Sequence, residues 1–172
     1  MIESIQKIDD KVLCDIGKIH TRFLNKFMVV ITKLGNNGII WFAISLPLIL
    51  NREYRYVGMK IIFALLLSGF LGEIIIKHLV GRMRPSKFIL PEDMLIKKPR
   101  TYSFPSGHTS SSFAAASIIS SYNIYFAIPA FILAILIAFS RLYLRVHYPS
   151  DVIAGAALGV LSAFLVNAFI VI

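Results

Sequence analysis

Three short clusters of polar residues could carry chemistry, and the first places two cations near a proline. Six residues separate Lys77 from the pair Arg84-Pro85. Lys77 lies in an otherwise apolar stretch, where a charge is costly and marks a candidate for function. Lys77 and Arg84 can share one face of a helix that Pro85 ends, and together they offer a point charge and a planar fork of donors to phosphate oxygens. The alternative is a structural ion pair between Lys77 and Glu73, one turn earlier.

The second cluster is the run Pro105-Ser106-Gly107-His108 at the expected start of a helix. The first amides of a helix are unpaired and the helix dipole is positive there, so this position favours an anion. Ser106 can cap the helix and donate its hydroxyl, and Gly107 lets a ligand approach the backbone closely. His108 can hold and deliver a proton near neutral pH. An ordinary helix start with an interfacial histidine is the alternative interpretation.

The third cluster places a histidine between an arginine and a carboxylate. Ser140-Arg141 is followed by His147 and, four residues later, by Asp151. A carboxylate at that spacing can accept a hydrogen bond from one imidazole nitrogen and leave the other nitrogen free to attack. Alternatively, Asp151 caps a helix while Arg141 and Arg145 extend to lipid headgroups, an interpretation that leaves the histidine unexplained.

The composition indicates that these clusters sit in a membrane protein. Hydrophobic residues make up 57% of the 172 residues and charged residues only 16%, whereas soluble domains have about a quarter charged. Apolar blocks cover residues 63–76, 124–139 and 152–172. The last block carries no charge and is long enough to cross a hydrocarbon core of about 30 Å.

These blocks predict an all-α, polytopic transmembrane helical bundle in a single domain, with five to six membrane helices. An amphipathic interfacial helix is expected over residues 1–22, ahead of a membrane bundle over 23–172, and a helix that packs on the bundle fits the first segment nearly as well. Residues 23–34 and 39–50 are predicted to form a hairpin of two short helices. Longer helices are expected over 57–80, from 105 to about 123, from there to 143, and from 150. Their ends would bring the three clusters to one membrane face.

The net charge of +9 limits the partners that the chain can have. Basic residues fall at the ends of apolar blocks and not along one soluble face, so no nucleic acid is expected. Anionic headgroups or a phosphorylated ligand would account for the charge. A single cysteine, Cys14, excludes a disulfide within the chain and a Cys/His metal cluster, and we expect neither a metal nor a cofactor. The pattern carries no signal for an oligomeric state.

The three clusters together, in this order and on these helix ends, resemble the type 2 phosphatidic acid phosphatase (PAP2) superfamily. The resemblance covers at least residues 65–158, and residues 32–36 are similar to the family's early turn. It implies that His147 is the nucleophile, that Asp151 orients it and that His108 is the general acid. It also implies a set of phosphate-binding groups without a metal ion: Lys77, Arg84, Ser106, Gly107 and Arg141. The stretch Gly81-Arg82-Met83 departs from the family, in which a second proline is frequent there.

The resemblance implies a membrane lipid phosphatase whose partners are a lipid phosphate substrate and the bilayer. The candidate substrates are undecaprenyl diphosphate, phosphatidylglycerophosphate, phosphatidate and the 1-phosphate of lipid A, with a polyprenyl diphosphate preferred. A catalytically silent protein that binds or transports lipid phosphates is the alternative function. We expect a multi-pass protein of the inner (cytoplasmic) membrane with its active site on the outer, periplasmic face. Counting basic residues leaves this orientation undecided.

Overall fold

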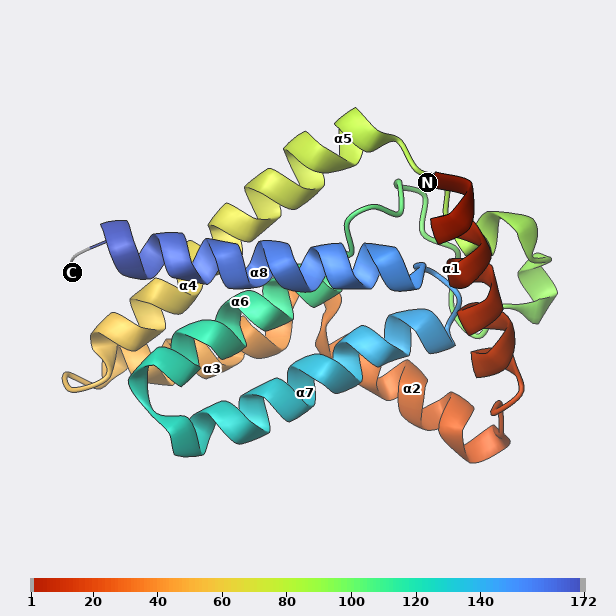
Figure 1. Cartoon of the computed structure of the whole chain (residues 1–172). Coiled ribbons are helices and arrows are strands. Elements are labelled where there is room, and N and C mark those ends of the chain that lie inside the picture. The colour runs from red at the N-terminus through yellow and green to blue at the C-terminus, as the bar shows by residue number, and fades with distance from the viewer. Residues whose placement is uncertain (1, 171–172) are drawn as a thin grey trace.

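The computed structural model describes residues 2–170 and is built of helices (Figure 1). Met1, in the predicted interfacial helix, and Val171 and Ile172, in the predicted membrane bundle, lie outside the described residues. The α-helices are α1 (Ile2–Gly17), α2 (Arg22–Leu34), α3 (Ile39–Leu50), α4 (Arg55–Gly69), α5 (Lys77–Val80), α6 (Gly107–Tyr122), α7 (Ile124–Tyr143) and α8 (Pro149–Phe169). Short 3₁₀ turns add η1 (Asn36–Gly38), η3 (Pro85–Phe88) and η4 (Pro91–Asp93), and a π-helical segment, η2 (Phe70–Ile76), joins α4 to α5.

Length and composition identify three helices of the described chain as candidate membrane spans. They are Arg55–Val80, Ile124–Tyr143 and Pro149–Phe169, and α2 with α3 could form a fourth, broken span. The structure thus confirms a polytopic all-α membrane protein. Helix α6 has 16 residues, includes a run of three serines from Ser110, and lies among the longer helices. The five to six spans expected from the sequence stay a prediction.

The predicted hairpin of α2 and α3 is wrong. The two helices meet at a bend of 49°, so the chain continues onward and does not reverse (Figure 1). The bend is made by two residues in the left-handed region, Asn37 with φ 50° and Gly38 with φ 69°. A turn signal with two glycines fits a bend as well as a reversal, because both require positive φ. As a result, helix α1 and the connection after α3 lie at opposite ends of the molecule.

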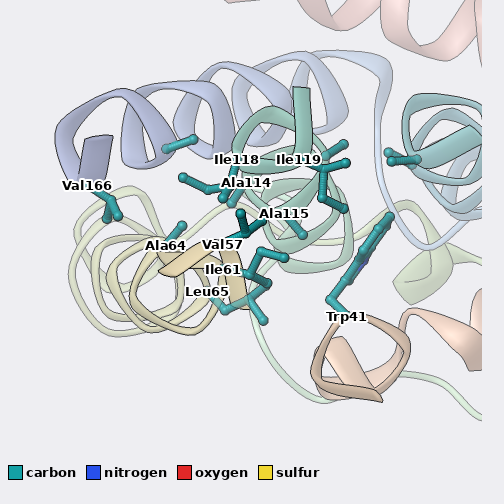
Figure 2. Packing of buried hydrophobic residues seen from close by; sticks show 14 of the residues in the cluster. Trp41, Val57, Ile61, Ala64, Leu65, Ala114, Ala115, Ile118, Ile119 and Val166 are labelled. Carbon is teal, nitrogen blue, oxygen red and sulfur yellow. The ribbon is translucent and has the colours of Figure 1, made fainter. Parts of the chain in front are cut away.

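Helix α6 packs tightly against α8, and this contact positions the second and third clusters. A Cβ atom added to Gly155 would lie 2.6 Å from the carbonyl oxygen of Ser106, and one added to Gly159 would collide with that of Ser110. The two backbones therefore approach each other as only glycine allows. Around them, Trp41 of α3, Ile61 of α4 and Ala115 of α6 form a buried apolar core (Figure 2).

Candidate active site

His147 lies in the connection between α7 and α8 and is 1% exposed. Its Nε2 is 2.8 Å from a terminal nitrogen of Arg84, and its Nδ1 is 3.5 Å from Oδ2 of Asp151. Because a guanidinium can only donate, Nε2 must carry the lone pair and Nδ1 the proton. The nitrogen that can attack therefore faces the cations, and the protonated nitrogen faces the carboxylate.

The surroundings of His147 keep its imidazole neutral. Burial, and then the positive charges of Arg84, Arg141 and Lys77, lower the pKa of His147 well below its usual value of 6.5. A histidine with a lowered pKa is unprotonated at pH 7, as a nucleophile must be.

Arg84 is fixed beside His147 by backbone and side-chain acceptors. Its Nε donates to the carbonyl oxygen of Thr101 at 2.7 Å, and a terminal nitrogen donates to that of Val146 at 2.9 Å. The Thr101 hydroxyl accepts a further bond at 3.1 Å. Thr101 and Val146 were not predicted from the sequence, since a carbonyl acceptor leaves no trace in residue type.

Lys77 and Arg141 complete a group of buried cations in the same pocket. Lys77 is 3% exposed and Arg141 5% exposed. Arg141 donates to the hydroxyl of Thr32, from the stretch that resembled the family's early turn. Lys77 forms an ion pair of 2.5 Å with Glu73. The ion pair with Glu73, which was the alternative interpretation of Lys77, is therefore formed. The same lysine also lines the pocket.

Glu73 places its carboxylate over the start of α6. A Cβ atom added to Gly107 would collide with Oε1 of Glu73, the oxygen that also pairs with Lys77. This is where the sequence predicts an anion, at the positive end of a helix and beside a lysine. The side chain is 46% exposed and belongs to the π-helical segment, a feature frequent at functional sites. A phosphate arriving there would have to displace the carboxylate.

The variant Glu73→Gln should strengthen the binding of small phosphate analogues. Removing one negative charge beside Lys77 should lower the inhibition constant of orthovanadate about tenfold. The reason is that a carboxylate a few ångströms from the bound anion repels it by about this much in a partly screened site. The measurement is inhibition of the phosphate release that the resemblance implies, with the purified protein in detergent. Glu92→Gln, at an exposed acid in the loop after α5, is the matched control and should leave the constant unchanged. Weaker binding in Glu73→Gln would mean that the carboxylate holds Lys77 in place for the anion.

Ser106 and His108 have partners that the sequence did not predict. The expected side-chain cap by Ser106 is wrong, because its hydroxyl accepts a bond from Thr109 at 2.9 Å and the residue is fully buried. Its amide instead donates to the carbonyl oxygen of Asp151 at 3.0 Å, which joins the starts of α6 and α8. The Nε2 of His108 lies 2.9 Å from Oδ1 of Asn36, at the bend between α2 and α3.

Asp151 is fully buried and has partners on both carboxylate oxygens. Oδ2 accepts from the amide of Tyr148 at 2.8 Å, and Oδ1 accepts from Arg82 at 2.8 Å. Asp151 therefore caps the start of α8, as one interpretation expected, and also lies beside Nδ1 of His147, as the other expected. Arg82 was not among the predicted site residues, because its role depends on contacts distant in sequence.

One pocket of about 920 Å³ lies beside these groups. Its polar lining includes the catalytic candidates Lys77, Arg84, His108, Arg141 and His147. Its apolar lining includes Phe42, Leu65, Leu66, Phe70 and Ile74 from α3, α4 and η2. A pocket with both kinds of lining fits a molecule that carries a phosphate and a hydrocarbon tail.

Residues 57–171 match the family described as the PAP2 superfamily. The chain belongs to the PAP2 superfamily. The match includes the three clusters, which the fold places around one pocket. As members of this superfamily are, the chain is a metal-independent lipid phosphate phosphatase and a multi-pass membrane protein.

Individual PAP2 proteins resemble the chain over most of its length. An undecaprenyl-diphosphatase of Sulfolobus acidocaldarius is 34% identical over 143 residues, which cover 83% of this chain and 68% of the relative. The crystal structure of a transmembrane PAP2 type phosphatidylglycerolphosphate phosphatase from Bacillus subtilis superposes with a TM-score of 0.78 at 26% identity, covering 96% of this chain and 86% of that one. The structure of LpxE from Aquifex aeolicus gives a TM-score of 0.80 at 28% identity, covering 94% and 96%.

Proposed function

We propose that this PAP2 enzyme hydrolyses a phosphate monoester or diphosphate of a membrane lipid through a phosphohistidine on Nε2 of His147. The observation that carries the proposal is the placement of that nitrogen, 2.8 Å from Arg84 and with Nδ1 facing Asp151. The lone pair of Nε2 forms the bond to phosphorus while the bond from phosphorus to the leaving oxygen breaks, which is the lipid oxygen of a monoester or the bridging oxygen of a diphosphate. His108 gives a proton to that oxygen. Water, deprotonated by His108, then attacks phosphorus, the bond from phosphorus to Nε2 breaks with its electron pair returning to His147, and inorganic phosphate leaves.

The remaining site residues hold the transferred phosphoryl group. Lys77, Arg84 and Arg141 neutralise its non-bridging oxygens, and the amide of Gly107 at the start of α6 adds a donor. Ser106 is proposed to contribute its hydroxyl, which would have to turn from Thr109 toward the pocket. Asp151 keeps the proton on Nδ1 and stabilises the positive charge that forms on the ring.

The apolar part of the pocket lining supports a lipid as the substrate. Phe42, Leu66 and Phe70 are 39%, 58% and 52% exposed and belong to candidate membrane spans. Exposed apolar side chains beside buried cations fit a tail that stays in the bilayer while its phosphate reaches the site.

A polyprenyl diphosphate is our proposed substrate class, supported by the likeness to an undecaprenyl-diphosphatase. Phosphate release should be measured with the purified protein on undecaprenyl diphosphate, phosphatidylglycerophosphate, phosphatidate and lipid A 1-phosphate. We expect the highest kcat/KM for undecaprenyl diphosphate, by about tenfold or more, a difference of about 1.4 kcal/mol in the barrier. A higher value for a glycerophospholipid would contradict the substrate class. Binding of every lipid without any turnover would favour the silent binding protein.

We propose that the site faces the outer side of the membrane, as the family resemblance implies. Two exposed positions at opposite ends of the molecule allow this orientation to be tested. Helix α1 contacts the active-site end, whereas Asn51 lies at the other end, where the nearby Tyr54 packs edge-to-face on Tyr122 at the last turn of α6. Most basic residues now lie at the active-site end, which by the positive-inside rule favours the opposite orientation. Arg82, Arg84 and Arg141 hold catalytic groups, however, and their positions do not report topology.

The native cysteine can decide the orientation. Cys14 is exposed on α1 and reports the active-site face, and Asn51→Cys in a Cys14→Ser background reports the far face. In intact cells we expect a membrane-impermeant thiol reagent to label Cys14 of the unmodified protein. The same reagent should leave the Asn51→Cys variant unlabelled until the membrane is opened. The reverse pattern would place the active site on the cytoplasmic side.

A further inference from the structure

Asp9 of α1 is buried although it belongs to a helix expected to lie in the membrane interface. Its side chain is 2% exposed, and Leu13, one turn later, is 7% exposed, so the two mark the face that packs on the bundle. Oδ1 of Asp9 accepts from the amide of Ser150 at 2.9 Å. Oδ2 accepts from the hydroxyl of Ser150 at 2.5 Å and from Arg82 at 2.7 Å. A buried carboxylate with this many donors has a fixed position.

Arg82 connects Asp9 to the carboxylate behind His147. One terminal nitrogen donates to Oδ1 of Asp151 at 2.8 Å and to the Ser150 hydroxyl at 2.6 Å. The other donates to Asp9 and to Oε1 of Gln6 at 2.7 Å. The guanidinium also lies 4.1 Å from the centre of the Tyr148 ring. The two ends of one planar group are thus held by an acid from α1 and an acid from α8.

The contacts from Asp9 through Arg82 to Asp151 fix the orientation of the Asp151 carboxylate. With Oδ1 held by Arg82, the carboxylate cannot rotate, and Oδ2 stays between the amide of Tyr148 and Nδ1 of His147. Nδ1 lies 3.5 Å from Oδ2 and has no hydrogen-bond partner among the described residues, so a small rotation of the carboxylate decides whether this hydrogen bond forms. Without Asp9, Arg82 would keep its charge and its bonds to Asp151 and Ser150 but would lose the charged acceptor that holds the other side of its plane.

We propose that Asp9 and Arg82 are positioning residues of the active site, which hold Asp151 in the orientation that His147 needs. Helix α1 then helps to position the catalytic site, a role that its predicted place at the membrane interface does not include. The inference rests on the proposed role of His147 as the nucleophile. Asp9 and Arg82 belong neither to the phosphate-binding cations nor to the apolar lining of the pocket. We therefore expect replacing them to lower the rate of the chemical step and to leave substrate binding unchanged.

The test compares two acids of the same helix. Asp9→Asn keeps the shape of the side chain and removes its charge, and we expect kcat to fall about tenfold with KM within about twofold, the size of effect seen when a partner that orients a catalytic group is lost. Asp15→Asn is the matched control, because Asp15 is exposed and pairs only with Lys18 in the described part of the chain. The control should retain the kcat of the unmodified enzyme. The thermal midpoint is measured for both variants.

A second comparison separates positioning from a stabilising contact. If Asp9 acts through Asp151, Asp9→Asn should lower kcat no further in an Asp151→Asn background. An equal fall in both backgrounds, or a rise in KM that accompanies the fall in kcat, would overturn the proposal. If Asp9→Asn does not yield folded protein, Ser150→Ala replaces it, since this variant removes the bridging hydroxyl and leaves both charges. We then expect a smaller fall of about threefold in kcat at unchanged KM, and an unchanged kcat would overturn the proposal.

The experiment also separates this inference from the function on which it rests. Phosphate release by the unmodified enzyme and by His147→Ala is measured in the same assay. An active enzyme that needs His147 but tolerates Asp9→Asn would refute the positioning role alone. An enzyme that is equally active without His147 would refute the proposed mechanism and the positioning role with it.

Discussion

Replacing His147 with alanine is expected to abolish phosphate release, with kcat lowered by about four orders of magnitude or more. In the proposed mechanism the imidazole supplies the attacking lone pair on Nε2, and in the described structure no other unprotonated nitrogen or oxygen nucleophile lies beside Arg84 with a carboxylate behind it. Loss of a nucleophile removes the covalent route entirely, and what remains is the electrostatic effect of the cations on water attack. The measurement is release of inorganic phosphate from a lipid phosphate in detergent.

A second histidine provides the control for this variant. His78 follows Lys77 on α5, is exposed, and has its Nδ1 against the carbonyl oxygen of Ile74. His78→Ala should therefore keep the activity of the unmodified enzyme. Full activity in His147→Ala would contradict the mechanism, and equal losses in both variants would show that histidine replacement acts through the fold. An unchanged thermal midpoint in both variants would exclude that second explanation.

Exchanging Arg84 for lysine is expected to lower kcat/KM by about 100- to 1,000-fold, although the formal charge is kept. Arg84 reaches two carbonyl oxygens, the Thr101 hydroxyl and Nε2 of His147 from one planar group. A lysine ammonium cannot reproduce this set, because its donors radiate from one atom. The fork that presents the nucleophile to the phosphate is lost even though a positive charge remains near it.

The control for Arg84→Lys is the variant Arg100→Lys, which makes the same replacement at an exposed arginine. Arg100 lies one residue before Thr101 and is exposed, so Arg100→Lys should leave kcat/KM within about twofold. Steady-state kinetics on the preferred lipid give both values. Equal kcat/KM in Arg84→Lys and the unmodified enzyme would mean that charge alone is needed at this position and that the orientation of His147 does not depend on the guanidinium.

The grouping of the catalytic candidates could be predicted because it depends on helix ends. Apolar blocks fix where helices start and stop, and alternate helix ends must meet at one face of a membrane. The spacing of His147 and Asp151 predicted a hydrogen bond between them. The structure brings Nδ1 to 3.5 Å from Oδ2, and no hydrogen bond is formed there. The structure places Lys77, Arg84, His108, Arg141 and His147 around one pocket, as that reasoning expected.

The incorrect predictions arise where a local pattern allows two geometries. The run Gly35-Asn36-Asn37-Gly38 supplies positive φ angles, which serve a bend of 49° as well as the reversal we expected. The choice depends on packing, because the bend brings Asn36 against His108 and Gly35 against the same ring. Ser106 likewise has the residue type of a helix cap, but its buried hydroxyl accepts a hydrogen bond from Thr109 and does not cap the helix.

The contacts that were missed join residues far apart in the chain. Asp9 and Arg82 are separated by 73 positions, and on α1 an aspartate among lysines is indistinguishable from a solvated one. Only the packing of α1 against the start of α8 shows that this carboxylate is buried. Carbonyl acceptors such as those of Thr101 and Val146 are invisible for a different reason, since every residue carries one.

Isolation of the phosphoryl-enzyme tests the proposed chemistry most directly. The enzyme is mixed with a lipid phosphate labelled with ³²P in its terminal phosphate, quenched in alkali within milliseconds, digested and analysed by mass spectrometry. We predict an acid-labile, alkali-stable phosphate on the peptide that contains His147, absent from His147→Ala and present at an undiminished level in His78→Ala. Label on another residue, or turnover by the unmodified enzyme with no labelled protein at any time point, would contradict a phosphohistidine at His147.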